Sequence, residues 1–223
     1  MSCNGEGKIK VAQRTIHYLF AEIISQQVDL KNKNRFLLGS VLPDAYCDVK
    51  DRDVTHFMVR EEHGKYVDFQ AFLERYYDQI QKDDLYLGYY IHLVEDAFYR
   101  NLFHNKYRKT PHSMEEVKRL HTDYHILNAY IVKKYGLQNE LDTTDDLPEE
   151  IFHEIADFRV KEFLAEMAED FREDIAGETY YITEKMVDEF VEDYLSLALQ
   201  EIESVKEGKS CLKVEDFVWG RKR

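Results

Sequence analysis

The sequence predicts an all-α protein, a single-domain bundle of about six or seven helices. Glycine and proline are scarce, at 9 and 3 of 223 residues, and sheets need more turn residues than that. Apolar residues recur at helical spacing along most of the chain, without internal repeats or low-complexity tracts. The length suits one domain with a sizeable core, so we expect residues 1–223 to form one helical domain.

The boundaries of the expected helices follow from periodicity and from residues typical of helix ends. Pro43 disfavours helix at the residue before it, Gly136 is typical of a helix end, and Pro148 and Thr183 are typical of helix starts. The expected helices are 8–27, a short one ending between Gly39 and Pro43, 66–82, 84–104, 114–135, 148–174 and 183–206. An irregular segment is expected at 53–59, and the tail packs Phe217 and Trp219 onto the body.

Charge and cysteine usage limit the function classes. The net charge is −14, from 44 acidic and 30 basic side chains, and such a surface repels phosphate backbones, so no nucleic-acid partner is expected. Three cysteines without metal-type spacing favour free thiols in a reducing compartment. No apolar stretch reaches transmembrane length, so we predict a cytoplasmic protein without stable membrane insertion. No oligomeric state follows from the sequence.

The stretch "YYIHLVEDAFYRNLFH" carries the strongest pair of polar residues. His92 and Asp96 are four residues apart, so they share one helical face and can ligate one divalent ion. Gly88, one turn earlier, leaves room beside that face. An isolated pattern of this kind is common, and a hydrogen-bonded core pair is its ordinary interpretation.

Three further residues are unremarkable when each is taken alone. His17 lies on an apolar helix, where a satisfied core histidine is the usual case. Asp44 follows a proline, where a turn or cap aspartate is typical. His56 lies in an expected loop, where exposure is the default.

The order of the surrounding motifs changes these interpretations. "RTIHYLFAEI", "FLLGSVLPDAY", "THF" and "LGYYIHLVEDAF" resemble, in this order, the zinc-dependent phospholipase C family. That family includes bacterial phosphatidylcholine-hydrolysing enzymes and clostridial alpha-toxin, with fungal single-strand nucleases as distant relatives. The chain is most similar to its small intracellular bacterial members. The resemblance covers about residues 10–135 and implies a bundle of the phospholipase C and nuclease type, completed by C-terminal helices within 148–223.

The resemblance also implies a set of metal ligands. His56, Asp44 and His92 would hold one ion, and Asp96 would bridge to a second ion that also takes His17. Imidazole and carboxylate ligands suit Zn²⁺, in about one to three ions, and also Mn²⁺ or Fe²⁺.

The ligands that complete the set stay open. The secreted enzymes have a further histidine and an HxxxE helix, whereas this chain has "RLHTDYHILN" without the glutamate. The small relatives resemble the pattern H-x-D there, so His121 and Asp123 are preferred as metal ligands over His125. His104 is a more distant alternative.

The implied function is a metal-dependent hydrolase of a phosphoester, similar to phospholipase C, which uses a metal-activated water. Asp44 is the candidate base, and Glu95, Tyr89 and Tyr99 are candidate partners of the ligands. The expected substrate is a small phosphorylated molecule or a lipid headgroup. The alternative is a non-catalytic helical protein with a structural or degenerate metal site. A phosphohydrolase of the HD type is excluded, because the chain has no adjacent His-Asp dipeptide.

Overall fold

The computed structural model describes residues 14–141, 154–171 and 176–220, and it confirms the all-α class. Short turns of 3-10 helix occupy Leu42–Asp44, Val49–Asp51, Ala168–Phe171 and Val214–Phe217, and a π-helical turn occupies Leu102–Lys106. The helices are α1 (Arg14–Ser25), α2 (Lys33–Val41), α3 (Arg52–Thr55), α4 (Phe69–Ile80), α5 (Asp84–Asn101), α6 (Met114–Tyr135), α8 (Val160–Met167) and α9 (Glu184–Lys206). One antiparallel hairpin, β1 (Met58–Glu61) and β2 (Gly64–Val67), is added to them.

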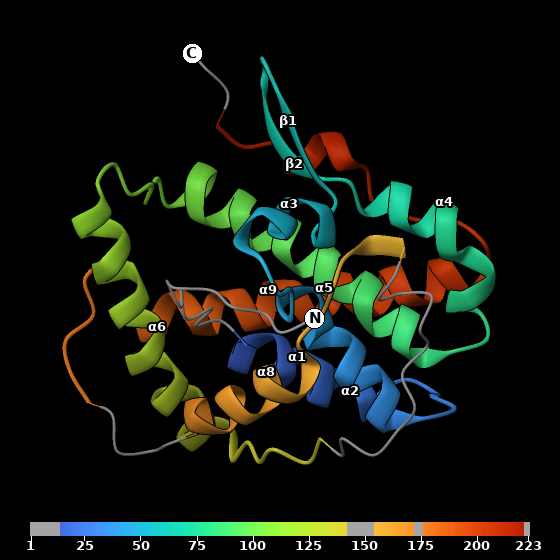
Figure 1. Cartoon of the computed structure of the whole chain (residues 1–223), viewed down its shortest axis with the longest axis horizontal. Coiled ribbons are helices and arrows are strands. Elements are labelled where there is room, and N and C mark those ends of the chain that lie inside the picture. The colour runs from blue at the N-terminus through green and yellow to red at the C-terminus, as the bar shows by residue number, and fades with distance from the viewer. Residues whose placement is uncertain (1–13, 142–153, 172–175, 221–223) are drawn as a thin grey trace.

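Helix α5 is the central element of the fold. All of its residues from Asp84 to Ala97 are buried, as expected for a helix that is largely apolar and aromatic. It packs against α2, α4 and α9, while α6 stands at one side of the molecule (Figure 1). The polar residues of α5 therefore lie inside the protein, where each needs a partner.

The helix-end residues behave as the sequence predicts. Gly136 ends α6 in the left-handed conformation, with φ of 60°, which glycine adopts without a Cβ penalty. Thr183 caps α9 by accepting a hydrogen bond from the backbone N–H of Met186. The predicted bounds 114–135 and 183–206 are therefore confirmed for these two helices, to within one residue.

The expectation of an irregular segment at 53–59 is wrong. The chain forms the short helix α3 and then turns into β1 at Phe57, whose φ is 48°. Strand β2 also occupies the start of the helix expected over 66–82, so α4 begins at Phe69. The hairpin is too short for its alternation to stand out among charged residues, and the C-terminal tail stabilises it: Lys65 and Trp219 exchange backbone hydrogen bonds of 2.9 and 3.0 Å.

The helix expected over 148–174 is interrupted within the described residues, because residues 154 and 155 are helical and residues 156–159 are not. Helix α8 starts at Val160, because the backbone before it pairs with the loop after Asp44 instead. The N–H of Cys47 donates to the carbonyl of Asp157 at 3.0 Å, and the N–H of Arg159 donates to that of Ala45 at 2.8 Å. Residues 148–153 and 172–174 of this prediction lie outside the described residues.

The prediction for the C-terminal tail and the prediction for the cysteines have different outcomes. Phe217 and Trp219 are buried, at 6% and 5% exposure, and so pack on the body as expected. The expectation of three free thiols is wrong for Cys47, which is disulfide-bonded. Cys211 carries a free thiol.

Candidate metal centre

The centre begins with the close crossing of α2 and α5. A Cβ atom on Gly39 would lie 2.1 Å from the carbonyl oxygen of Leu85, and one on Gly88 would lie 2.2 Å from that of Phe36. Only glycine therefore permits this approach at both positions. The crossing brings the carbonyl oxygen of Ser40 to 2.7 Å from Nδ1 of His92.

The same backbone arrangement recurs at His56. Its Nδ1 lies 2.9 Å from the carbonyl oxygen of Arg52, one turn earlier, and 3.0 Å from the hydroxyl of Thr55. Tyr89 supports this turn from α5, because its hydroxyl donates to the carbonyl of Thr55 at 2.6 Å. His56 is 1% exposed, so the expectation that it is exposed, made when it was taken alone, is wrong.

These contacts determine which nitrogens face the centre. A carbonyl oxygen only accepts hydrogen bonds, so Nδ1 of both His92 and His56 carries a proton. In the neutral rings each Nε2 then has a lone pair and no proton. The two Nε2 atoms lie 3.4 Å apart, so two lone pairs converge in a buried space where neither can donate to the other. A tetrahedral zinc ion with Zn–N bonds of 2.0–2.1 Å separates two such nitrogens by about 3.3–3.4 Å.

Two carboxylates complete this group of ligand atoms. Oδ1 of Asp44 lies 3.2 Å from Nε2 of His56, and Oδ2 of Asp96 lies 3.9 Å from it. Asp44 is held in the 3-10 turn Leu42–Asp44, in which Pro43 is the second residue. Asp96 lies one helical turn after His92, as their spacing predicted.

His17 reaches the same centre from α1. Its ring lies 4.0 Å from that of His92, between centroids, and its Nε2 is 3.8 Å from Oδ2 of Asp44. Its Nδ1 is 3.0 Å from Oε2 of Glu95, but outside the angular range of a hydrogen bond. Within the described residues, Oε1 of Glu95 is buried without a hydrogen-bond partner. A carboxylate beside the distal nitrogen of a histidine is the usual support of a metal ligand.

The electrostatics keep the two aspartates ionised. Burial raises the pKa of Asp96, but the charge of Arg100 and those of the nearby histidines outweigh it, and the net pKa is well below the usual range. Nη2 of Arg100 lies 2.8 Å from Oδ2 of Asp96. Burial also raises the pKa of Asp44, but the nearby ring of His56, with the other histidines, lowers it overall. The centre therefore presents anionic oxygen atoms.

Burial and the neighbouring charges also shift the pKa values of two histidines and of Glu95. Burial and the charge of His17 lower the pKa of His92 to about 3, which keeps that ring neutral. Burial alone would lower the pKa of His17, but Glu95 and the two aspartates raise it to about 9. The pKa of Glu95 itself is raised, chiefly by burial. Bound cations would offset this crowding of carboxylates, because an opposite charge favours their ionised form.

The five residues that the family resemblance implies as metal ligands thus meet at one place. Their ligand atoms form two groups in which every atom lies within 4.8 Å of the others. His92 belongs to both groups, so they form one continuous cluster. The groups are His17, Asp44 and His92, and His56, His92 and Asp96.

The residues proposed to complete the set lie elsewhere in the described structure. Asp123 accepts backbone hydrogen bonds from Tyr180, Tyr181 and Ile182, at 2.8, 2.5 and 3.1 Å, so its oxygens hold that segment against α6. His121 is half-buried beside Tyr124, with 6.2 Å between ring centroids.

His104 and His125 also lie outside the two ligand groups of the described residues. His104 contacts the hydroxyl of Thr110 at 2.9 Å and stacks on Trp219. Of the candidate supporting residues, Glu95 and Tyr89 contact the centre or its turn, and Tyr99 binds Tyr124 instead.

Two residues near the centre carried no sequence signal. Tyr46 lies beside His56, with 6.4 Å between ring centroids, and burial, with the charge of Asp44, raises its pKa to about 12. Arg52 is exposed and forms no ion pair with the described residues. Arginines are frequent in exposed turns, and only the fold places this one beside the centre.

A model of the zinc-dependent phospholipase C family matches residues 16–205. The chain belongs to this family. The resemblance of the four ordered motifs is thereby confirmed, and it extends beyond residue 135 into the C-terminal helices. No curated protein and no solved structure matches the chain.

The zinc dependence of the family agrees with the chemistry of the ligand groups, which can hold metal ions. No helix among the described residues of this zinc-dependent phospholipase C family member is long and apolar enough to span a bilayer.

Proposed function

We propose that the protein is a metal-dependent hydrolase of phosphoesters, with its reaction centre at the cluster around His92. The observation that carries this proposal is the 3.4 Å approach of the Nε2 atoms of His56 and His92, both of which have Nδ1 directed at a backbone carbonyl. Such an arrangement is unfavourable without a cation and suits one well. Asp44 and Asp96 supply the anionic ligands.

The residues would divide the work as follows. His56 and His92, with Asp44 and Asp96, would hold a first ion, and His17 with the other oxygen of Asp44 would contribute to a second. Bound divalent ions supply Lewis-acid stabilisation of phosphoryl oxygens and lower the pKa of a bound water.

The proposed catalytic role of Asp44 rests on its position. It lies between His17 and His56 and contacts both rings. Its lowered pKa keeps it ionised near neutral pH, so it can accept a hydrogen bond from an attacking water and orient it. Glu95 would hold the ring of His17.

Arg52 is proposed to receive the substrate phosphate. The net charge of −14 repels anions, so a phosphoester needs local positive charge near the centre. The charge of Arg52 acts on the phenols of Tyr46 and Tyr124, which border the cluster, and it has no carboxylate partner among the described residues. The substrate would be a small phosphorylated molecule or a lipid headgroup, in agreement with the family.

The alternative is a structural metal site without turnover. The burial of the ligands favours it: His17, Asp44, His56, His92 and Asp96 are each at most 3% exposed, and closed sites are typical of structural zinc.

Hydrolysis assays with metal exchange separate these two functions. Chelator-treated protein is reloaded with Zn²⁺, Mn²⁺ or Fe²⁺ and assayed on bis(p-nitrophenyl) phosphate and on a short-chain phosphatidylcholine. We expect turnover that disappears with chelation and returns with metal. Full metal occupancy without turnover on either substrate would support the structural site and contradict the proposed hydrolase.

A further inference from the structure

Arg100 occupies one oxygen of a proposed metal ligand. It lies one turn after Asp96 on α5, and its Nε and Nη2 lie 3.1 and 2.8 Å from Oδ2 of that residue. An ionised carboxylate has about two lone-pair sites on each oxygen, so these two N–H groups take both sites of Oδ2. From the described residues, no hydrogen bond reaches Oδ1. While Arg100 stays in place, Asp96 therefore has one oxygen to give to a cation.

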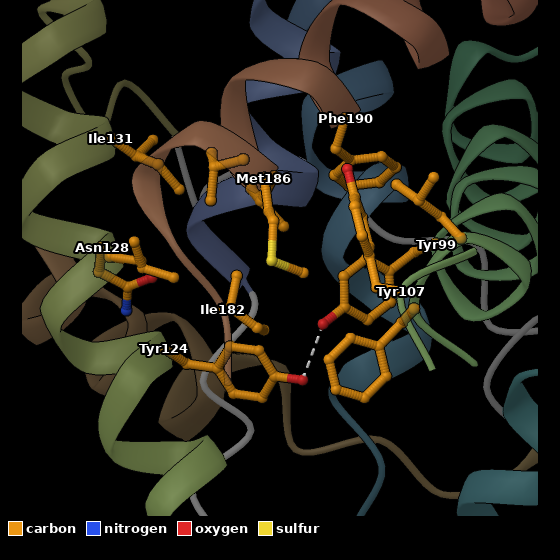
Figure 2. A pocket seen from close by; sticks show the side chains of 13 residues that line it. Tyr99, Tyr107, Tyr124, Asn128, Ile131, Ile182, Met186 and Phe190 are labelled. Carbon is orange, nitrogen blue, oxygen red and sulfur yellow. Dashed lines mark hydrogen bonds between the residues drawn. The ribbon is translucent and has the colours of Figure 1, made fainter. Parts of the chain in front are cut away.

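Other contacts hold Arg100 beside this carboxylate. Its Cζ lies 5.4 Å from the ring centroid of Trp219, a position that cation–π attraction favours. Trp219 is 5% exposed and pairs with strand β2 through its backbone, so the tail fixes this ring. The charge of Arg100 also acts on the phenols of Tyr99 and Tyr124, and Figure 2 shows their hydroxyls, 3.0 Å apart, facing one another. The guanidinium is thus held by groups outside the metal centre.

The other aspartate of the centre has different surroundings. Among the described residues, no lysine or arginine pairs with Asp44. Its Oδ1 lies 3.2 Å from Nε2 of His56, and its Oδ2 lies 3.8 Å from Nε2 of His17. Each oxygen of Asp44 is therefore available to a cation beside a different histidine. The family resemblance assigns the bridge between two ions to Asp96, and in this chain Arg100 opposes that role.

The number of available oxygens influences which metal ion a site prefers. One oxygen from each aspartate, with the two facing Nε2 atoms, gives four ligand atoms for the first ion. Zn²⁺ is satisfied by about four ligands in tetrahedral geometry, whereas Mn²⁺ favours about six, mainly oxygens, in octahedral geometry. A second oxygen from Asp96 would therefore help Mn²⁺ more than Zn²⁺.

We propose that Arg100 is a specificity-determining residue of the metal centre, which limits Asp96 to one ligand oxygen and so favours Zn²⁺ over Mn²⁺ at the first ion. This inference rests on the proposed function, because it requires metal ions at the cluster around His92. Asp44, rather than Asp96, would then join the two ions.

Metal binding by Arg100→Met tests the proposal. Methionine suits a helix and the apolar contacts of the replaced side chain, but it carries no charge and donates no hydrogen bond. Metal-free protein is titrated with Zn²⁺ in competition with a chromophoric chelator, and with Mn²⁺ while electron paramagnetic resonance follows the free ion. We expect the ratio of the Mn²⁺ to the Zn²⁺ dissociation constant to fall by about tenfold, because Oδ2 of Asp96 becomes available.

The ratio distinguishes this role from a merely structural one. If Arg100 only stabilised the fold, Arg100→Met would weaken the binding of both ions alike. A ratio equal to that of the unmodified protein, whatever the separate affinities, would overturn the proposal.

Arg119 offers a matched control on α6. It lies four residues after Glu115, with 2.8 Å between its Nη2 and Oε1 of that residue. Its Cζ lies 5.0 Å from the ring centroid of Tyr180, so an arginine, a carboxylate and an aromatic ring repeat the arrangement at an exposed place. Arg119→Met should leave the ratio unchanged. A shift as large as that of Arg100→Met would contradict a specific role for Arg100.

A crystal structure of the unmodified protein loaded with Zn²⁺ tests the same point if Arg100→Met does not fold, as judged by circular dichroism. We expect Asp96 to bind the ion through Oδ1, with Arg100 retained on Oδ2. Binding through both oxygens, or through Oδ2 with Arg100 displaced, would overturn the proposal.

Hydrolysis assays on the same samples separate this inference from the proposed function. A tenfold shift of the ratio, in a protein that hydrolyses neither bis(p-nitrophenyl) phosphate nor short-chain phosphatidylcholine, would support the role of Arg100 and contradict the hydrolase. Hydrolysis of either substrate, with an unchanged ratio in Arg100→Met, would overturn the role of Arg100 and leave the proposed function standing.

Discussion

Two buried regions of this protein contain acidic groups, and their surroundings differ. At the junction of α6 with residues 180–182, Asp123 faces three backbone N–H donors. In the cluster around His92, lone pairs of imidazole and carboxylate groups face one another, and Oε1 of Glu95 has no partner among the described residues. The first carboxylate is fully occupied by the fold, whereas the second region offers atoms that can hold cations. Burial alone therefore does not distinguish a structural acid from a metal ligand, but the nature of its neighbours does.

The largest expected effect comes from removing a ligand at the centre. His56→Ala should lower the metal content below about one ion per chain and reduce hydrolysis by about 10³-fold or more, because the variant loses an imidazole ligand. Metal analysis and steady-state kinetics measure both effects. His63→Ala, at an exposed histidine, is the control, and metal content equal to the control would contradict the role of His56.

The next effect concerns the close crossing that positions His92. Gly88→Ala introduces a methyl group where Cβ lies 2.2 Å from a backbone oxygen, so α2 and α5 must separate. We expect the free energy of unfolding to fall by about 3 kcal/mol, with weaker metal binding because Ser40 moves away from His92. Gly136→Asn should cost less, since asparagine tolerates the left-handed conformation. Urea unfolding compares the two, and equal losses would contradict the packing argument.

Asp123→Asn tests the other region. The amide retains only part of the acceptor capacity of the carboxylate, so we expect a loss of stability of about 2 kcal/mol, typical of hydrogen bonds to a charged group. The metal content should not change. Metal loss as large as that of His56→Ala would show that Asp123 is a ligand and would remove the distinction between the two regions.

The smallest effect is expected at Glu95. Glu95→Gln leaves all five proposed ligands in place but weakens the support of His17, so metal affinity should fall by about 10–100-fold. Competition with a chromophoric chelator measures this change. Glu116→Gln, at a half-buried glutamate on α6, is the control, and identical affinities of the two variants would contradict a supporting role for Glu95.

Much of the fold could be predicted from local sequence signals. Gly136 marks the end of α6, and Thr183 marks the start of α9, because capping chemistry acts within one turn. The hairpin 58–67 and the late start of α8 could not be predicted in this way. Both depend on backbone partners far along the chain, Trp219 for the hairpin and residues 45–47 for the segment before α8.

The candidate site also combines features that the sequence predicts with features that depend on distant parts of the chain. The structure brings together His17, Asp44, His56, His92 and Asp96, which the ordered motifs singled out; their roles as ligands stay a prediction. The partners of Asp123 lie 57–59 residues away, so no local pattern distinguished it from a ligand. A cytoplasmic location also stays a prediction, and the disulfide at Cys47 removes one observation on which it depended.

The most direct test is a crystal structure of the metal-loaded protein with anomalous diffraction data at the zinc edge. The account predicts an anomalous peak bound by Nε2 of both His56 and His92, with oxygen ligands from Asp44 or Asp96, and no peak at Asp123. A peak at His121 and Asp123, or metal-loaded crystals without a peak at His92, would contradict the account.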